Sequence, residues 1–363
     1  MSELQKKCLR LLRRYGGYAA PVILLSAVWI CSRNPALAEG YMCRVYPVIA
    51  VALSSFSRLF PFSFFDVLLA AVLVLLAGGG IAVMIKKLRF RRWIGWCCRL
   101  LLWLPVWFYL SWGMSYFRPD FHERLSVERQ APDKTFFEAF VVRYIDSLNR
   151  SYTAIDMDSF DAEEIDREIE RMYEKHHVRL RLPYPCGSRR TKHTLFEPLL
   201  TRTGVTGFFD PFFNEVQVNR FMLPHSYPFT LAHEKAHQFG IACEAECNFY
   251  ASVVCTASSH PQVRYSGYLK TTSYLLNSLY GMFPGEYERI YQMIDSCVIS
   301  DYRKIHDHWK KAIRPALSDA QNKLYNCYLK TNRQASGINS YSEVTGLLVD
   351  WEASFPPVSD RRL

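Results

Sequence analysis

Two histidines and a glutamate lie close together in His233-Glu234-Lys235-Ala236-His237, which has the form HExxH. Residues four apart share one face of a helix, so His233 and His237 can present both imidazoles to one Zn²⁺. Glu234 lies one residue round from His233, where its carboxylate can take a proton from zinc-bound water. Zinc lowers the pKa of that water from about 15.7 to about 7. The pattern therefore predicts a catalytic zinc site with Glu234 as the general base.

A helix must carry this motif, and the flanking residues favour one. Thr230 can cap its N-terminus, and Gly240 is suited to end it. If the helix continued straight, Glu244 would lie about 10.5 Å beyond His237, too far to bind the same ion. We therefore expect the chain to turn at Gly240 and to begin a second helix near Cys243. That helix would return Glu244 to the metal as its third ligand.

Other residues near Glu244 leave alternatives open. Asn248 shares its helix face and can orient a ligand from behind. Glu246 is a rival third ligand on another face of the same helix. Cys243 and Cys247, together with the two histidines, would instead form a closed structural zinc site without a position for water.

Substrate contacts are predicted around the motif. An edge strand near the zinc helix can bind an extended peptide by main-chain pairing. Residues 214–219 alternate strictly and are the best strand candidate in this part of the chain. The oxyanion of the transition state needs a donor besides zinc, and tyrosines after the second helix, with His260, could supply it. The candidate substrate-binding residues are Asn214, Val216, Val218, Tyr265 and Tyr268.

The elements that must position these residues are mostly helical. Helical periodicity is found at 134–151, 161–178, 230–240, 244–258, 262–281, 283–310, 316–330 and 340–351. Charge pairs on 161–178 indicate a solvated face. We expect a mainly α (α+β) zincin-like domain with a small sheet over residues 133–363, preceded by a polar linker at 118–132.

The net charge points to a membrane. The 363 residues carry a formal charge of +10, which by itself would suggest nucleic-acid binding. However, residues 1–117 hold fourteen basic and three acidic side chains, whereas residues 118–363 hold thirty and thirty-one. The basic excess thus flanks long apolar runs in the first third. We expect a lipid bilayer as partner and no nucleic acid.

Three uncharged runs are each close to the roughly 20 residues that span a bilayer. They are residues 15–32, 67–85 and 100–117. Residues 45–57 are too short to span and are predicted to be interfacial. Basic residues gather before the first run and between the second and third, which places residues 118–363 outside the cytoplasm. That orientation reverses if 45–57 spans, and the first run also has the form of a signal peptide cleaved near 36–38.

The sequence resembles an uncharacterised bacterial family of membrane-anchored proteins with a zinc-metallopeptidase-like HExxHQxG domain. The resemblance rests on HEKAHQFG and EAECNFYA, on PFFNEVQVN before them, and on PFSFFD at 61–66. It covers most of the chain, is strongest over 205–260, and is weaker at 337–348. It implies a bacterial cytoplasmic membrane as the location.

The local pattern is also similar to gluzincin peptidases, in which a glutamate on a second helix follows HExxH. This similarity implies His233, His237 and Glu244 as metal ligands, Glu234 as the base and Asn248 as a supporting residue. Two features depart from it. Cys247 stands where alanine is usual, and only six residues separate His237 from Glu244, far fewer than in most gluzincins.

Together these observations predict a membrane-anchored zinc metallopeptidase that hydrolyses peptide bonds. The alternative is a non-catalytic, zinc-binding sensor or partner-binding module on the membrane. An intact Glu234 argues against the alternative, because structural zinc needs no general base.

Overall fold

The structure is a computed structural model that describes residues 3–130, 133–155, 160–184, 186–187, 189–332 and 341–355. It divides into two compact units. The first unit comprises Met1–Arg118, Gly187–Arg189 and Asp210–Glu215, and the second comprises Pro119–Cys186, Arg190–Phe209 and Val216–Leu363. The boundary near residue 118 coincides with the end of the apolar third of the sequence.

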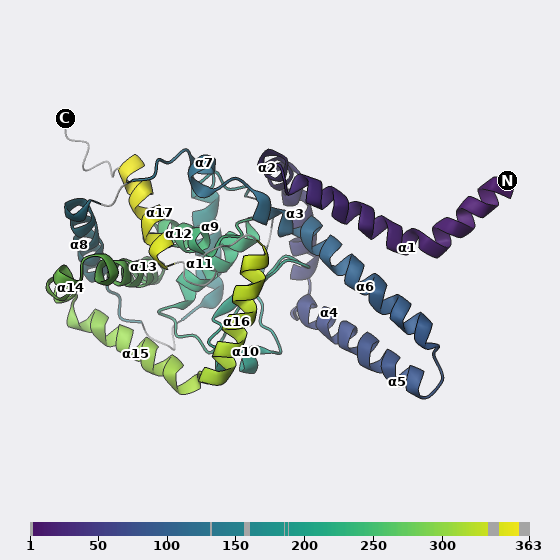
Figure 1. Cartoon of the computed structure of the whole chain (residues 1–363). Helices are drawn as coiled ribbons and strands as arrows, with labels where there is room; N and C mark the ends of the chain where they lie inside the picture. The colour runs from purple at the N-terminus through teal and green to yellow at the C-terminus, as the bar shows by residue number, and fades with distance from the viewer. Residues whose placement is uncertain are drawn as a thin grey trace. The chain divides into compact units, whose positions relative to one another are not determined.

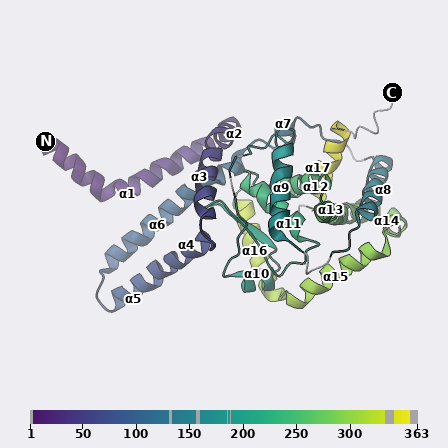
Figure 2. The ribbon, with the colours of Figure 1, turned by 180° about the vertical axis from the view of Figure 1, so that it is seen from behind.

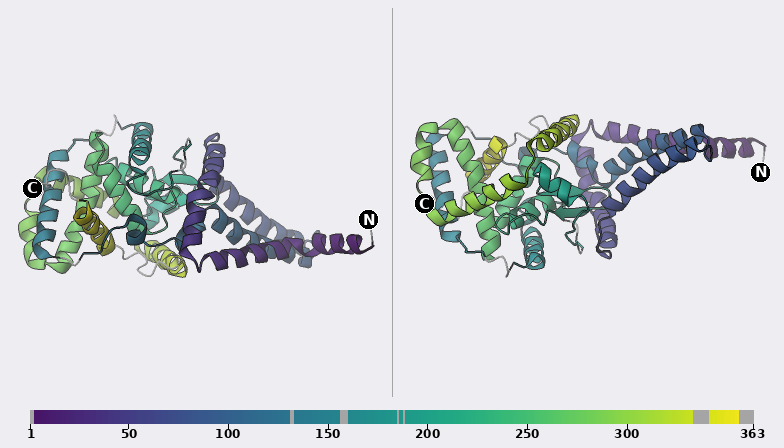
Figure 3. Two further views of the ribbon diagram at one scale, coloured as in Figure 1. Left: turned by 90° about the horizontal axis from the view of Figure 1, so that it is seen from above. Right: turned by 90° about the horizontal axis from the view of Figure 1, so that it is seen from below.

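The first unit is helical. Its elements are α1 (Glu3–Cys31), α2 (Pro35–Arg44), α3 (Tyr46–Arg58), α4 (Phe64–Leu73), the π-helical turn η1 (Val74–Gly78), α5 (Gly79–Met84), α6 (Phe90–Ser111) and the 3₁₀ turn η2 (Gly113–Phe117). Helix α6 packs along α1 on one side and against α5 on another (Figures 1 and 3).

Two stretches of this unit are long and apolar enough to cross a membrane. They are Phe64–Met84, which joins α4, η1 and α5, and Phe90–Ser111, which is α6. Gly16–Cys31 and Pro35–Arg44 meet at 112° and give a third span if this bent pair crosses as one. These helices are consistent with membrane association, and the short α3 is not among them.

The third predicted span, 100–117, differs from the structure at both ends. Helix α6 starts ten residues earlier, at Phe90, and ends at Ser111 before η2. The prediction followed the uncharged run, but arginine is a good helix former, so Arg91, Arg92 and Arg99 continue the helix. Gly113 begins the tighter turn that follows it.

The second unit is mainly α with a small sheet, as predicted. Its elements are α7 (Phe121–Leu125), α8 (Lys134–Ser151), α9 (Ala162–His176), α10 (Glu197–Thr203), β1 (Gly207–Asp210), β2 (Glu215–Val218), α11 (Tyr227–Gln238), α12 (Glu244–Thr256), α13 (Pro261–Met282), α14 (Pro284–Tyr291), α15 (Ser296–Ala312), α16 (Pro315–Thr331) and α17 (Tyr341–Ser354). Helices α11, α12 and α13 form the centre, and α8, α9 and α17 pack around them (Figure 2).

Two expectations about this unit need correction. The predicted linker at 118–132 contains α7, and its Phe121, Leu125 and Val127 are buried in the core. Its two prolines suggested an extended linker, but apolar side chains between polar ones are enough to anchor it. The helix predicted over 283–310 is two helices, because Asp295 is extended and separates α14 from α15.

Candidate metal centre

Helix α11 carries the HExxH motif and begins earlier than predicted. Its first residue is Tyr227, so Thr230 lies inside the helix and does not cap it. Pro228 in the first turn favours this start, because its fixed φ suits a helix and its missing N–H would have no helical partner there. The earlier start places His233 and His237 in the second half of a three-turn helix.

The turn predicted at Gly240 is present. Gly240 has φ of +86°, a left-handed conformation that favours glycine. Its N–H donates to the carbonyl of His237, and the N–H of Ile241 donates to that of Ala236. This pair of bonds is the Schellman ending of a helix. It reverses the chain within five residues, so that α12 begins at Glu244.

Glu244 lies beside both histidines. Its Oε2 is 3.2 Å from Nε2 of His233, and its Oε1 is 3.5 Å from Nε2 of His237. His233, Glu234 and His237 also each offer a ligand atom within 4.8 Å of the others. The structure thus brings together the four residues that the sequence analysis assigned to the metal and the base.

Hydrogen bonds on the far sides of the imidazoles fix which nitrogens face Glu244. Nδ1 of His233 is 2.8 Å from Oδ1 of Asn248, and Nδ1 of His237 is 2.8 Å from the carbonyl oxygen of Ile241. Both partners are acceptors, so each Nδ1 carries a hydrogen, and each Nε2 is the nitrogen that faces Glu244. Tyr274 donates to the same Oδ1 of Asn248 at 3.0 Å, which holds the amide in this orientation.

The result is a convergence of metal-ligand atoms. Two Nε2 nitrogens and a carboxylate meet, and either a proton shared with Glu244 or a metal cation can join them. Ligand atoms around tetrahedral zinc lie about 3.3 Å apart when the bonds are about 2.0–2.1 Å. The separations of 3.2 and 3.5 Å are close to this value. The donor set and its spacing therefore fit zinc.

Electrostatics in the centre favour the same arrangement. Burial would raise the pKa of the Glu244 carboxyl, but the two imidazoles hold it well below its usual range. Burial raises the pKa of Glu234, whose side chain is only 6% exposed. A carboxylate with a raised pKa is a stronger base, which is the property that a proton acceptor needs.

Glu246, the rival third ligand, points elsewhere. Its carboxylate is ion-paired with the buried guanidinium of Arg124, which also lies 3.5 Å from the hydroxyl of Tyr250. Arg124 belongs to α7, in the segment that was expected to be a linker. Sequence reasoning missed this partner, because 122 residues separate the two.

The two neighbouring cysteines do not face the centre as thiolates. Burial raises the pKa of Cys247 to about 12, so its thiol is neutral at pH 7. Its Sγ lies 3.2 Å from Nδ1 of His237, on the opposite side of the ring from Nε2. Cys243 is the N-cap of α12, and burial raises its pKa too. The arrangement does not favour a closed site with two cysteines.

The predicted substrate contacts lie away from these residues. Tyr265 donates to Asp301 at 2.8 Å, and the Tyr268 ring lies 5.8 Å from that of Tyr144. His260 is 3.6 Å from a carboxylate oxygen of Glu164 on α9. None of these contacts is with the histidines of the motif.

The predicted edge strand, β2, has a partner on each side. Val216 and Val218 of β2 are buried, with β1 on one side and a parallel bridge from Gln217 to Lys192 on the other. Asn214 is buried in the first unit, where it donates to the hydroxyl of Tyr46. The alternating pattern identified the strand but not its neighbours. Among the described strands, β1 is the outer one.

Strand β1 closely approaches the motif. A Cβ at Gly207 would lie 3.0 Å from Cγ and 3.1 Å from Oε1 of Glu234. Only glycine therefore allows this approach without displacing the glutamate. Gly207 precedes the alternating residues 214–219, so no alternation marked it as part of a strand.

Two tyrosines in the centre were missed. Tyr274 supports Asn248, and the hydroxyl of Tyr325 donates to Oε1 of Glu244. They come from α13 and α16, 26 and 81 residues beyond their partners. Nothing in their local sequence distinguishes them from other helical tyrosines.

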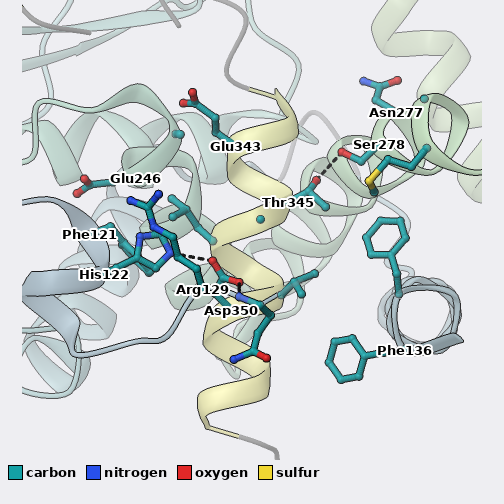
Figure 4. A pocket seen from close by; sticks show the side chains of 18 of the residues that line it. Phe121, His122, Arg129, Phe136, Glu246, Asn277, Ser278, Glu343, Thr345 and Asp350 are labelled. Atoms are coloured by element: carbon teal, nitrogen blue, oxygen red, sulfur yellow. Dashed lines mark hydrogen bonds and ion pairs between the residues drawn. The ribbon is translucent and has the colours of Figure 1, made fainter. Parts of the chain in front are cut away.

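A cavity of about 840 Å³ borders the first turn of α12, the turn that carries Glu244 (Figure 4). Phe121, Phe137 and Leu347 are among its apolar walls, and His122 pairs with Asp350 at 2.7 Å on its polar side. Cys243, Ala245 and Glu246 line it. Glu244 faces the histidines instead, so the cavity adjoins the centre without including its ligands.

Comparison with known proteins gives one match. The model of a family described as "Protein of unknown function (DUF3810)" matches residues 41–349. No curated protein and no solved structure matches the chain. The matched range includes most of the first unit and all the residues of the candidate centre.

Proposed function

The chain belongs to the family described as protein of unknown function (DUF3810), and we propose that it is a membrane-anchored, zinc-dependent peptidase. One observation carries the proposal. Nε2 of His233, Nε2 of His237 and the carboxylate of Glu244 converge while both Nδ1 hydrogens are donated elsewhere. A divalent cation satisfies this arrangement, and the ligand types suit zinc.

The ligand set favours a catalytic over a structural role. Two imidazoles and one carboxylate leave the fourth position of a tetrahedral ion open. When bound there, zinc would lower the pKa of water and polarise a substrate carbonyl. Asn248 and the carbonyl of Ile241 orient the two imidazoles from behind, as supporting residues of zinc sites do.

Glu234 is the proposed general base. It takes a proton from the attacking water and later gives it to the leaving amine. Its buried carboxylate lies against β1 at Gly207, so a peptide paired with this outer strand would pass beside it. We include a zincin-like fold in the proposal, since α11, the turn at Gly240, α12 and an adjacent strand are all present.

The location is part of the proposal. The candidate spans support a membrane anchor, and basic residues cluster before the first span and between the last two. By the positive-inside rule, the second unit would lie outside the cytoplasm of a bacterium, tethered to the cytoplasmic membrane. Its substrate would be a peptide or protein in that compartment.

The test uses the full chain purified in detergent and loaded with zinc. Metal content and cleavage of a peptide library are measured for the wild type, for Glu234→Gln and for the exposed control Glu128→Gln. We expect Glu234→Gln to keep one zinc per chain and to lose at least about 1000-fold in kcat/KM, because the base is gone while the ligands remain. The control should match the wild type.

Two outcomes would overturn the proposal. A wild type that binds zinc and cleaves no peptide would favour the non-catalytic zinc-binding module. Cleavage that is unchanged in Glu234→Gln would show that the activity arises elsewhere or from a contaminant.

A further inference from the structure

Helix α16 places one polar group on the candidate metal centre. The hydroxyl of Tyr325 donates to Oε1 of Glu244, the carboxylate oxygen that also faces Nε2 of His237. Tyr325 is partly buried, whereas its neighbours Leu324 and Tyr328 are 75% and 39% exposed. The phenol thus points from a largely solvated helix toward the centre.

A hydrolytic centre needs a donor at this place. When water attacks a peptide carbonyl, negative charge develops on the carbonyl oxygen, and a fixed hydrogen-bond donor beside it lowers the barrier. The hydroxyl of Tyr265 is held by Asp301, and that of Tyr274 is held by Asn248 behind His233. Tyr325 approaches instead on the side where Glu244 faces both histidines.

We propose that Tyr325 is a catalytic residue of this centre, the hydrogen-bond donor to the substrate oxyanion. The proposal rests on the proposed peptidase function. In the free protein the phenol donates to Glu244. When substrate binds, the same hydroxyl donates to the carbonyl oxygen, and it does so most strongly when that oxygen becomes negative. The phenol keeps its proton throughout, so no bond is made or broken at Tyr325.

The chemistry of tyrosine suits this role. A phenol is neutral at pH 7 and is a good donor, so it stabilises a developing anion without repelling the metal. Its present acceptor is the carboxylate of Glu244, whose oxygen would bind the metal ion when that ion is present. The hydroxyl can therefore exchange one anionic oxygen for another without being left unsatisfied.

The test compares Tyr325→Phe with Tyr328→Phe in the full-length, zinc-loaded protein. Tyr328 is the matched control, since its ring stacks on that of Tyr325 at 6.1 Å on the same helix. We expect Tyr325→Phe to lower kcat by about 100-fold, with a change in KM of less than about threefold and unchanged zinc content. Tyr328→Phe should keep wild-type kcat.

A second measurement separates catalysis from structure. Phosphinic peptides resemble the tetrahedral transition state, so Tyr325→Phe should weaken their binding by about the same factor as kcat/KM. An uncleaved peptide with the same side chains should bind equally well to both proteins. A merely structural role would change both ligands or neither.

Several results would overturn this assignment. These are an unchanged kcat in Tyr325→Phe, an equal loss in Tyr328→Phe, or a gain in kcat/KM, which would mean that Tyr325 shields the centre. In each case cleavage that depends on Glu234 would still stand. If the wild type cleaves nothing, the peptidase proposal itself fails, and this assignment fails with it.

Discussion

Helix α11 holds two groups of charged side chains that differ in the source of their positive charge. In the lysine cluster, Nζ of Lys235 lies 2.7 Å from Asp166 and 2.6 Å from Glu170 of α9. In the candidate metal centre, Glu234 and Glu244 meet two imidazoles whose Nδ1 hydrogens are donated away. A lysine balances the first group, whereas the positive charge of the second falls on imidazoles, which are also side chains that bind zinc in proteins.

This difference separates a structural lysine from the proposed functional residues within one five-residue motif. Lys235 is 1% exposed, and burial alone would lower its pKa, but the two carboxylates raise it above the usual value. It therefore stays charged and holds α11 on α9. In the proposed function, the imidazoles and the carboxylate of Glu244 instead bind a metal ion, and Glu234 acts on water.

The largest expected effect concerns the third ligand. Glu244→Gln should weaken zinc binding by about 1000-fold, or about 4 kcal/mol, because a neutral amide replaces a charged ligand. Glu246→Gln is the matched change two residues further along the same helix. It should lower the melting temperature by removing the carboxylate that balances the buried charge of Arg124, and should keep zinc affinity within about threefold.

Competition with a zinc-responsive dye and thermal melts of the metal-free proteins measure both effects. Loss of zinc binding in Glu246→Gln together with retention in Glu244→Gln would reverse the ligand assignment.

The next effect tests the lysine cluster. Lys235→Met should destabilise the protein by about 3 kcal/mol, because it leaves two carboxylates facing each other without their cation. Zinc affinity should stay at the wild-type level, since the cluster lies outside the centre. Denaturant unfolding and zinc titration measure the two quantities, with the exposed Lys310→Met as control. Equal loss of stability in Lys310→Met would remove the special role of Lys235.

The sequence predicted those features of the candidate metal centre that depend on residues close together in the chain. The spacing of His233 and His237, the turn at Gly240 and the start of α12 follow from helix geometry and from the conformational freedom of glycine. Contacts between residues distant in the chain could not be predicted from these local rules. The charges of α9 were assigned to a solvated face, yet Asp166 and Glu170 bind Lys235.

The same holds for residues that approach the centre from other elements. Arg124 lies in the supposed linker, Tyr325 lies in an ordinary helical pattern, and Gly207 lies before the alternating residues 214–219. Their roles depend on how helices and strands pack. The periodicity of a segment predicts its secondary structure but not which other segment it packs against.

The smallest effect tests the residue that prepares the centre for a cation. Asn248→Ala should weaken zinc binding by about 10- to 100-fold, because His233 loses the acceptor that keeps hydrogen on Nδ1 and its Nε2 toward the metal. Asn149→Ala is the control. Its amide donates to the carbonyl of Met293 at 2.8 Å and accepts from the N–H of Asp295 at 3.1 Å, away from the centre.

Asn149→Ala should therefore lower stability but not zinc affinity, while Asn248→Ala does the reverse. Tyr274→Phe extends the series, since it removes only the hydroxyl that steadies Asn248 and should weaken zinc binding less than Asn248→Ala. If all three variants lost zinc in proportion to stability, the centre would depend on global packing. An order of Asn248, Tyr274 and then Asn149 would instead show that electron pairs directed by hydrogen bonds select the cation.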